Sequence, residues 1–318
     1  MCANGIAGAR RNRSHGRGPG GVMSATLPPT GAPVRWVLDD GLLIVTIDHP
    51  PVNALSHAVR VGLMEAAERL DTDAAAQAML LCSTGTVYIG GADIREFSGP
   101  RRAPMLNEVC HRIEACTKPV IAVVHGAALG GGLEVALASH YRVAAPAAMV
   151  AFPEVLLGLL PGAGGTQRAP RLCGAALALD LMLTGRRMSA ADALDAGLVD
   201  VVDDTPRVYA ERWARTIIAA GAPLPRARDG GALRDTDGAR AEVARALDAI
   251  PHDSASPDMH AFARARILRC VTAAIDVPFE QGAQVEADAF LECLASPERE
   301  VLVAQFFAAR AARKAPNG

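Results

Sequence analysis

The sequence predicts an α/β domain that is followed by a region made almost entirely of helices. Two observations support this fold class. Between residues 34 and 203, short runs of strand-forming residues alternate with segments whose apolar residues recur at helical spacing. From residue 241 to residue 312 only helical patterns occur, separated by prolines. The 318 residues are enough for one large domain with a helical appendage.

The expected strands are short apolar runs that turn signals or prolines bound. Asp39-Asp40-Gly41 lies between the first two runs and predicts a hairpin. Lys118-Pro119 precedes a β-branched run that has the length of a central strand. In chain order, the expected strands are residues 34–38, 42–47, 78–82, 120–124, 141–144 and 149–152.

The expected helices carry an apolar face at a spacing of three and four residues. Ser56 is placed as the N-cap of the first helix. Ser189 and Asp192 form a weak capping box, and Gly197 provides the C-terminal stop of that helix. In chain order, the expected helices are residues 56–70, 133–139, 175–184, 189–196, 208–219, 241–249, 261–275, 280–294 and 298–312.

Composition divides the chain into four parts. Residues 1–30 are Gly, Arg, Ser and Pro with little apolar periodicity, so we expect a disordered N-terminal extension. A basic arm that contacts nucleic acid is the alternative, but Met23 opens the first ordinary-looking sequence and favours an extended gene start. Residues 31–220 are the expected catalytic domain, 221–240 a mobile linker and 241–318 a helical region.

Overall charge and cysteine content favour a small-molecule substrate. The net charge of −2 provides no global attraction to nucleic acid or to an anionic membrane, so neither is expected as a partner. No run reaches the roughly 18 apolar residues that a membrane-spanning helix needs. The seven cysteines are odd in number and form no CxxC motif, so we expect reduced thiols in a cytoplasmic protein.

The stretch from residue 119 to residue 167 is almost free of charge. Only Glu134, Arg142 and Glu154 are charged there, whereas 21% of the whole chain is charged. A carboxylate inside such an apolar segment is desolvated, which raises its pKa and makes it a candidate for proton transfer. The alternatives are a helix-dipole glutamate for Glu134 and a surface-loop residue for Glu154.

Glycines near these carboxylates expose backbone amides. Ala92 follows two glycines, and Gly131 lies at the start of the helix that carries Glu134. The two N–H groups of Ala92 and Gly131 could converge on one developing oxyanion, although a plain tight turn at Gly90-Gly91 is the alternative. No cluster of His and Cys has the spacing of metal ligands, so no metal site is expected.

Five motifs together resemble the crotonase superfamily. The motifs are PPVNAL at residues 50–55, GADI at 91–94, ALGGGLE at 128–134, PEVLLG at 153–158 and PGAGGTQ at 161–167. The chain is most similar to the N-terminal hydratase/isomerase half of multifunctional fatty-acid oxidation enzymes, and we expect no dehydrogenase half because no GxGxxG motif follows. The resemblance implies a crotonase-like spiral of ββα units with a C-terminal helical region.

The resemblance also implies roles for particular residues. Ala92 and Gly131 would form the oxyanion hole, and Glu134 and Glu154 would be the catalytic glutamates. The residues implied in substrate binding are Gly91, Ala92, Asp93, Ile94 and Gly131. Residues 85–90 depart from the family, because they lack its usual basic residue and phenylalanine ahead of GADI.

The implied reaction is the reversible hydration of trans-2-enoyl-CoA to 3-hydroxyacyl-CoA in fatty-acid β-oxidation. Family members that act only as Δ3,Δ2-enoyl-CoA isomerases commonly lack the first glutamate, so the presence of both favours hydration. An isomerase or another crotonase-type reaction is the alternative, and an inactive acyl-CoA-binding or assembly module is a third. No cofactor is expected beyond the coenzyme A of the substrate. The expected assembly is a homo-oligomer, a trimer or a multiple of it, or a monomer.

Deletion of residues 1–21 should leave both enoyl-CoA turnover and melting temperature unchanged, because this segment has too few apolar residues to join a core. The shortened and full-length chains would be compared by crotonyl-CoA turnover and by thermal melting. A large loss of either quantity would mean that the segment belongs to the fold or to the site.

Overall fold

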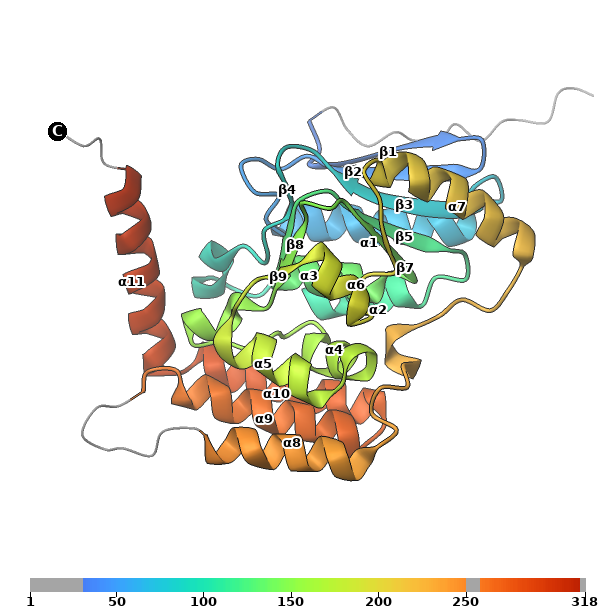
Figure 1. Cartoon of the computed structure of the whole chain (residues 1–318). Coiled ribbons are helices and arrows are strands. Elements are labelled where there is room, and N and C mark those ends of the chain that lie inside the picture. Colours follow the sequence, from blue (N-terminus) through green and yellow to red (C-terminus); the bar gives the residue numbers. More distant parts are fainter. Residues whose placement is uncertain (1–30, 250–257, 315–318) are drawn as a thin grey trace, which may run out of the picture.

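Two β-sheets organise the part of the chain that the computed structural model describes, residues 31–249 and 258–314 (Figure 1). The strands are β1 (Val34–Asp39), β2 (Leu42–Ile47), β3 (Ala78–Ser83), β4 (Val87–Ile89), β5 (Val120–Val124), β6 (Ala127–Leu129), β7 (Tyr141–Ala144), β8 (Met149–Ala151), β9 (Met188–Ser189) and β10 (Val201–Val202). The larger sheet has the order β1-β2-β3-β5-β7-β10, and the smaller has the order β4-β6-β8-β9. The pairs β1–β2 and β8–β9 are antiparallel, and the other neighbouring strands are parallel.

Helices follow pairs of strands in a repeating order. The α-helices are α1 (His57–Thr72), α2 (Leu106–Glu114), α3 (Gly131–Ala138), α4 (Gly165–Cys173), α5 (Ala175–Thr184), α6 (Ala190–Asp195), α7 (Pro206–Ala220), α8 (Thr236–Asp248), α9 (Ala261–Asp276), α10 (Phe279–Leu294) and α11 (Pro297–Lys314). Short 3₁₀ helices are η1 (Ile94–Ser98), η2 (Pro153–Leu157) and η3 (Ala227–Asp229). In β3-β4-α2, β5-β6-α3 and β7-β8-α4, the first strand joins the larger sheet and the second joins the smaller. These stacked ββα units confirm the expected fold class.

The sequence reading missed four elements inside this repeat. Strands β4 and β6 have three residues each, which is too short for an apolar alternation to be recognised. Helix α2 was not anticipated either. Helix α4 was not predicted because it begins at a glycine and contains Pro170. Its polar residues are buried, so it also lacks the exposed polar face that is typical of a surface helix.

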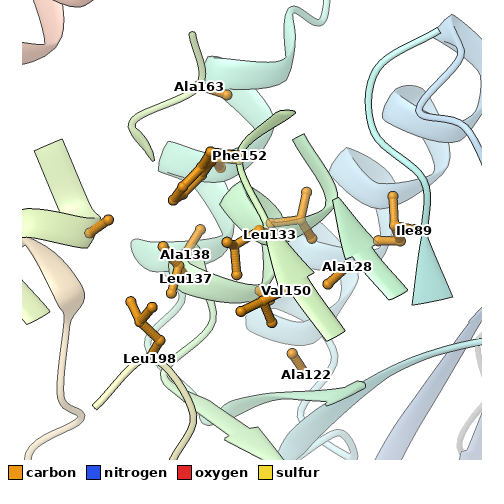
Figure 2. Close-up of a cluster of buried hydrophobic side chains, with 14 of the residues drawn as sticks. Ile89, Ala122, Ala128, Leu133, Leu137, Ala138, Val150, Phe152, Ala163 and Leu198 are labelled. Atoms are coloured by element: carbon orange, nitrogen blue, oxygen red, sulfur yellow. The ribbon is translucent and has the colours of Figure 1, made fainter. Parts of the chain in front are cut away.

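Helix α3 is enclosed by the core on all sides. All eight of its residues are buried. Figure 2 shows Leu133 and Leu137 of this helix gathered with Val150 of β8 and with Phe152, all in one cluster of buried side chains. Because no face of α3 reaches solvent, Glu134 is held inside the protein by its neighbours.

The C-terminal helices cover the end of the domain that carries α4 and α5 (Figure 1). Helix α9 contacts α4, α8 and α10, and α10 also contacts α4. Helix α11 stands to one side and contacts η2, with Leu302 buried there. The C-terminal helices therefore pack directly on η2, α4 and α5.

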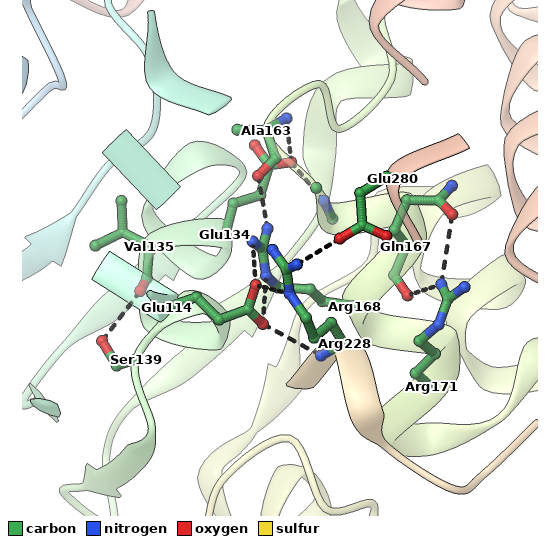
Figure 3. A network of polar contacts seen from close by, with 12 residues as sticks. Glu114, Glu134, Val135, Ser139, Ala163, Gln167, Arg168, Arg171, Arg228 and Glu280 are labelled. Carbon is green, nitrogen blue, oxygen red and sulfur yellow. Dashed lines mark hydrogen bonds and ion pairs between the residues drawn. The ribbon is translucent and has the colours of Figure 1, made fainter. Parts of the chain in front are cut away.

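Residues 221–240, which we expected to form a mobile linker, pack against the protein. Ala227 and Leu233 are buried, and α8 already begins at Thr236. The Arg228 side chain forms an ion pair of 2.8 Å with the buried Glu114, as Figure 3 shows. The polar composition was misleading because these polar groups find partners within the fold. The division of the chain into domains stays a prediction, and the expected disorder of residues 1–30 lies outside the described residues.

Arg228→Met should destabilise the protein by about 1 to 3 kcal/mol, because it removes a charged hydrogen-bond donor from a buried carboxylate. The matched control is Arg240→Met, whose ion pairs lie at the surface, so its loss of stability should be much smaller. Urea unfolding of both variants measures the difference. Equal losses would show that residues 221–235 are not fixed to the domain by Arg228.

Candidate active site

The four residues predicted to carry the chemistry line one pocket of about 180 Å³. Ala92 precedes η1, Gly131 and Glu134 belong to α3, and Glu154 belongs to η2. Helix α10 supplies part of the remaining wall. Its wall residues are Ala287, Phe290 and Leu291. The ββα repeat thus brings three separate motifs to one place.

Two backbone amides are available in this pocket. A Cβ placed on Gly131 would lie 3.4 Å from the Ala92 nitrogen, so the two positions are adjacent. Among the described residues, neither the N–H of Ala92 nor that of Gly131 donates a hydrogen bond. The segment before Ala92 is fixed in place, because the Leu55 N–H donates to the Gly91 carbonyl at 2.9 Å. Two adjacent free donors are the arrangement that an oxyanion requires.

Gly130 allows a carboxylate to approach the start of α3. Its φ is +52°, a left-handed conformation that favours glycine. A Cβ at this position would lie 2.6 Å from Oε1 of Glu154. Any larger residue at position 130 would therefore push Glu154 away from the amides.

Glu134 is a buried carboxylate held by a glycine-rich loop. It is 2% exposed, and its Oε1 accepts hydrogen bonds from the N–H groups of Ala163 at 2.7 Å and Gly165 at 2.8 Å. Burial raises the pKa of Glu134 to about 7, although the two amides and the charge of Arg168 oppose this shift. At neutral pH this group can therefore gain or lose a proton easily.

Glu154 faces the same pocket with fewer partners. Its Oε2 is buried and accepts no hydrogen bond from the described residues. Burial and, secondly, the negative charge of Glu134 raise the pKa of Glu154 well above its ordinary value. Two close buried carboxylates resist being ionised together, so the pair favours one protonated and one ionised member. Such a pair holds an acid and a base at the same time.

Asp93 is the one member of the predicted substrate-binding set that lies outside the pocket wall. Its side chain does not line the pocket, whereas Gly91, Ala92 and Ile94 do. The Asp93 carboxylate instead caps η1 by accepting from the Arg95 N–H at 3.1 Å, and it forms an ion pair with the Arg95 guanidinium at 2.7 Å. These bonds lower the pKa of Asp93. The Asp93 side chain thus has a structural role as the cap of η1.

A further buried carboxylate close to the pocket was missed by the sequence reading. Glu286 of α10 is 2% exposed and accepts from the N–H groups of Gly164 at 2.5 Å and Thr166 at 2.9 Å. Burial and the charge of Glu134 raise the pKa of Glu286 to about 8. Glutamates at positions 280, 286 and 292 lie on three different sides of a helix, so their spacing alone does not show which one is buried. Nothing in the local pattern therefore marked the middle one.

A buried ion pair supports the glycine-rich loop that binds Glu134, as the network in Figure 3 shows. Arg168 is fully buried, donates to the Ala163 carbonyl at 3.0 Å and pairs with Glu114 at 2.8 Å. Arg228 shares the same carboxylate. The sequence reading missed this network too, because its members come from α2, α4 and η3.

Comparison with known proteins assigns the family. Residues 38–226 match the family model described as enoyl-CoA hydratase/isomerase. The chain belongs to this family. Its crotonase fold agrees with a solved enoyl-CoA hydratase/isomerase from Pseudoalteromonas atlantica, with a TM-score of 0.64 and 26% identity, over 87% of this chain and 97% of that one.

Relatives within the family include longer proteins. The chain is 40% identical over 277 residues to a peroxisomal bifunctional enzyme of Danio rerio. The matched segment covers 85% of this chain but only 37% of the relative. A probable enoyl-CoA hydratase of Bacillus subtilis is 42% identical over 175 residues, 53% of this chain and 68% of the relative. The chain thus spans less than half the length of the bifunctional relatives that it matches.

Other expectations stay predictions. No helix between residues 31–249 or 258–314 is both long and apolar enough to cross a membrane. Within the same ranges, no group of three or more His, Cys, Asp or Glu residues could hold a metal ion. The need for a cofactor, the oligomeric state and the cytoplasmic location are untested, and several relatives are named as peroxisomal proteins.

Glu134→Gln should stabilise the protein more at pH 8 than at pH 5. Because the pKa of Glu134 is raised on folding from about 4.5 to about 7, the folded chain keeps a proton there that the unfolded chain loses as the pH rises. The loss of stability caused by Glu134 is therefore present in the native protein and absent from the variant, whereas the losses caused by Glu154 and Glu286 occur in both. Thermal melting at the two pH values measures the difference, with Glu65→Gln on the exposed side of α1 as the control. A Tm difference independent of pH would contradict the raised pKa.

Proposed function

We propose that this chain catalyses the reversible hydration of trans-2-enoyl-CoA to 3-hydroxyacyl-CoA. The observation that carries the proposal is the meeting of two buried carboxylates and two adjacent free amides in one pocket. The family assignment supports the same reaction class. The reaction involves no net oxidation or reduction, because it adds one water molecule to the enoyl-CoA.

The amides would stabilise the negative charge that forms during the reaction. The thioester oxygen would accept from the N–H groups of Ala92 and Gly131, where Gly131 also opens helix α3 with its positive dipole end. Polarising the thioester withdraws electrons from the conjugated double bond. Carbon C3 then becomes open to attack by water, and the charge passes to the enolate oxygen in the hole.

The glutamates would move the two protons of this addition. We assign the water to Glu134, whose Oε1 is fixed by two amides and whose Oε2 accepts no hydrogen bond from the described residues. Glu134 takes a proton from the water as the oxygen bonds to C3. Glu154, whose pKa is raised well above its ordinary value, delivers a proton to C2. The reverse transfers give dehydration.

The apolar wall of the pocket fits an acyl chain. Phe97 and Phe290 both line it and pack edge to face against each other, with ring centroids 6.0 Å apart. Leu157 and Leu291 also line it. Burial of an alkyl chain against these side chains would contribute binding free energy in proportion to its apolar area. A place in fatty-acid β-oxidation is supported by the name of an Arabidopsis thaliana relative, a peroxisomal fatty acid beta-oxidation multifunctional protein.

An isomerase activity at the same site is a second candidate. The unpartnered Oε2 of Glu154 is free to carry a proton between C4 and C2, which is all that moving a Δ3 double bond to Δ2 requires. The oxyanion hole would serve both reactions, since both pass through an enolate.

Two substitutions separate these reactions. Glu134→Gln should lower the hydration rate by roughly 100-fold or more but leave measurable isomerisation, because only hydration needs a base for water. Glu154→Gln should abolish both. The rates with crotonyl-CoA and with a 3-enoyl-CoA measure this division, after melting curves confirm that each variant is folded.

An amide of the same shape relieves a desolvated charge, so both variants should fold. If Glu134→Gln loses isomerisation as completely as Glu154→Gln does, the division of labour is wrong. Tight acyl-CoA binding without turnover in the unmodified chain would instead favour an inactive binding module.

A further inference from the structure

The loop of residues 163–166 donates its four consecutive amides alternately to two buried glutamates. The N–H groups of Ala163 and Gly165 bind Glu134 at 2.7 and 2.8 Å. Those of Gly164 and Thr166 bind Glu286 at 2.5 and 2.9 Å. One carboxylate belongs to the proposed catalytic pair, and the other comes from α10, 122 residues after Gly164.

The loop can make both sets of bonds because glycine occupies its middle. Gly164 has a φ of +97°, which lets successive amides turn toward different acceptors. At Gly165 a Cβ would lie 2.8 Å from Oε1 of Glu134. The loop therefore binds both carboxylates at once. A change in its backbone next to one carboxylate must move the amides that bind the other.

Helix α10 fits against this loop along one face. Gly282, Glu286 and Phe290 follow one another at intervals of four residues and so share that face. A Cβ on Gly282 would overlap the Gln167 side chain, and a Cβ on Gly162 would lie 2.5 Å from the Phe290 ring. Because close contacts exist on both sides of Glu286, its carboxylate has little freedom to move away from the loop.

The Thr166 side chain extends this anchorage to α9. Its hydroxyl donates to Oε2 of Glu286 at 2.5 Å and accepts from Nε2 of Gln167 at 3.0 Å. Gln167 also donates to the Cys270 carbonyl at 2.9 Å. The loop is thus tied to two helices of the C-terminal region by side chains that are all buried.

Packing alone is a poor account of Glu286. Burying a carboxylate costs free energy, and apolar residues of similar volume often fill such a position without loss of stability. What apolar residues could not supply is a pair of acceptors for Gly164 and Thr166. Without these two acceptors, nothing would fix the backbone conformation of the loop at Ala163 and Gly165.

We infer that Glu286 is a positioning residue for Glu134, acting through the 163–166 loop. By holding Gly164 and Thr166, it keeps the amides of Ala163 and Gly165 directed at Oε1 of Glu134, so that the other oxygen faces the water. This inference rests on the proposed hydration reaction. It adds that the C-terminal helical region sets the geometry of the proposed base as well as lining the pocket.

Glu286→Gln tests the inference. The amide has one oxygen in place of two, so either Gly164 or Thr166 faces an NH₂ group and loses its acceptor. Misdirection of Glu134 should lower kcat for crotonyl-CoA by about 10- to 100-fold. KM should change less than about threefold, because the acyl wall and the oxyanion amides are untouched. The matched control is Glu292→Gln, which changes a partly exposed glutamate of the same helix that pairs with Arg266 and Arg269, and it should leave both constants unchanged.

A second substitution keeps the inference testable if Glu286→Gln does not fold. Thr166→Val removes the hydroxyl bond to Glu286 and should lower kcat in the same direction by a smaller factor, whereas Thr166→Ser keeps the hydroxyl and should restore it. An unchanged kcat in folded Glu286→Gln would overturn the positioning role. So would a rise in KM with kcat intact, since that would place Glu286 in substrate binding.

The unmodified chain distinguishes this failure from failure of the proposed function. If it hydrates no enoyl-CoA of any chain length, the reaction is wrong and the positioning role falls with it. If it hydrates crotonyl-CoA and Glu286→Gln does so at the same rate, only the positioning role is wrong.

Discussion

Desolvation of carboxylates is the constraint on which the site depends. Helix α3 has no exposed face, so Glu134 must either lose its charge or accept hydrogen bonds that offset the free-energy cost of desolvating it. The structure offers two amides, from Ala163 and Gly165, which support the ionised form without neutralising it. The pKa of Glu134 therefore comes to about 7 and is not returned to its ordinary value. The same burial that costs stability is what makes proton transfer accessible at neutral pH.

Glycine is the second requirement, because buried carboxylates of this kind must be approached by backbone. Gly130 leaves room for Glu154, and Gly165 leaves room for Glu134. A side chain at either place would displace the carboxylate by occupying its position. The low charge and high glycine content of residues 119–167 suit a largely buried segment in which main-chain amides donate hydrogen bonds to carboxylates.

These local requirements explain what could be predicted from the sequence. Glu134 and Glu154 stood out against apolar neighbours, and the glycines beside Ala92 and Gly131 marked exposed amides, so the structure places all four in one pocket. Apolar runs also marked five strands of the larger sheet, β1, β2, β3, β5 and β7, whereas the two-residue strand β10 was missed. The residues whose partners are distant in sequence gave no such signal. Glu286 and Arg228 each lie in polar, ordinary-looking surroundings, and only the folded chain shows that their charges are directed inward.

Residues of α10 that the sequence reading missed extend the site beyond the segment that the family model matches. The family model matches residues 38–226, which stops before α8 begins at Thr236. Yet α10 contributes Phe290 and Leu291 to the pocket and Glu286 to the loop that holds Glu134. A solved enoyl-CoA hydratase/isomerase resembles 87% of this chain, so the likeness in fold extends beyond the matched segment. The helical region is therefore an appendage in sequence only: in space it closes the pocket and meets the loop on which the position of the proposed base depends.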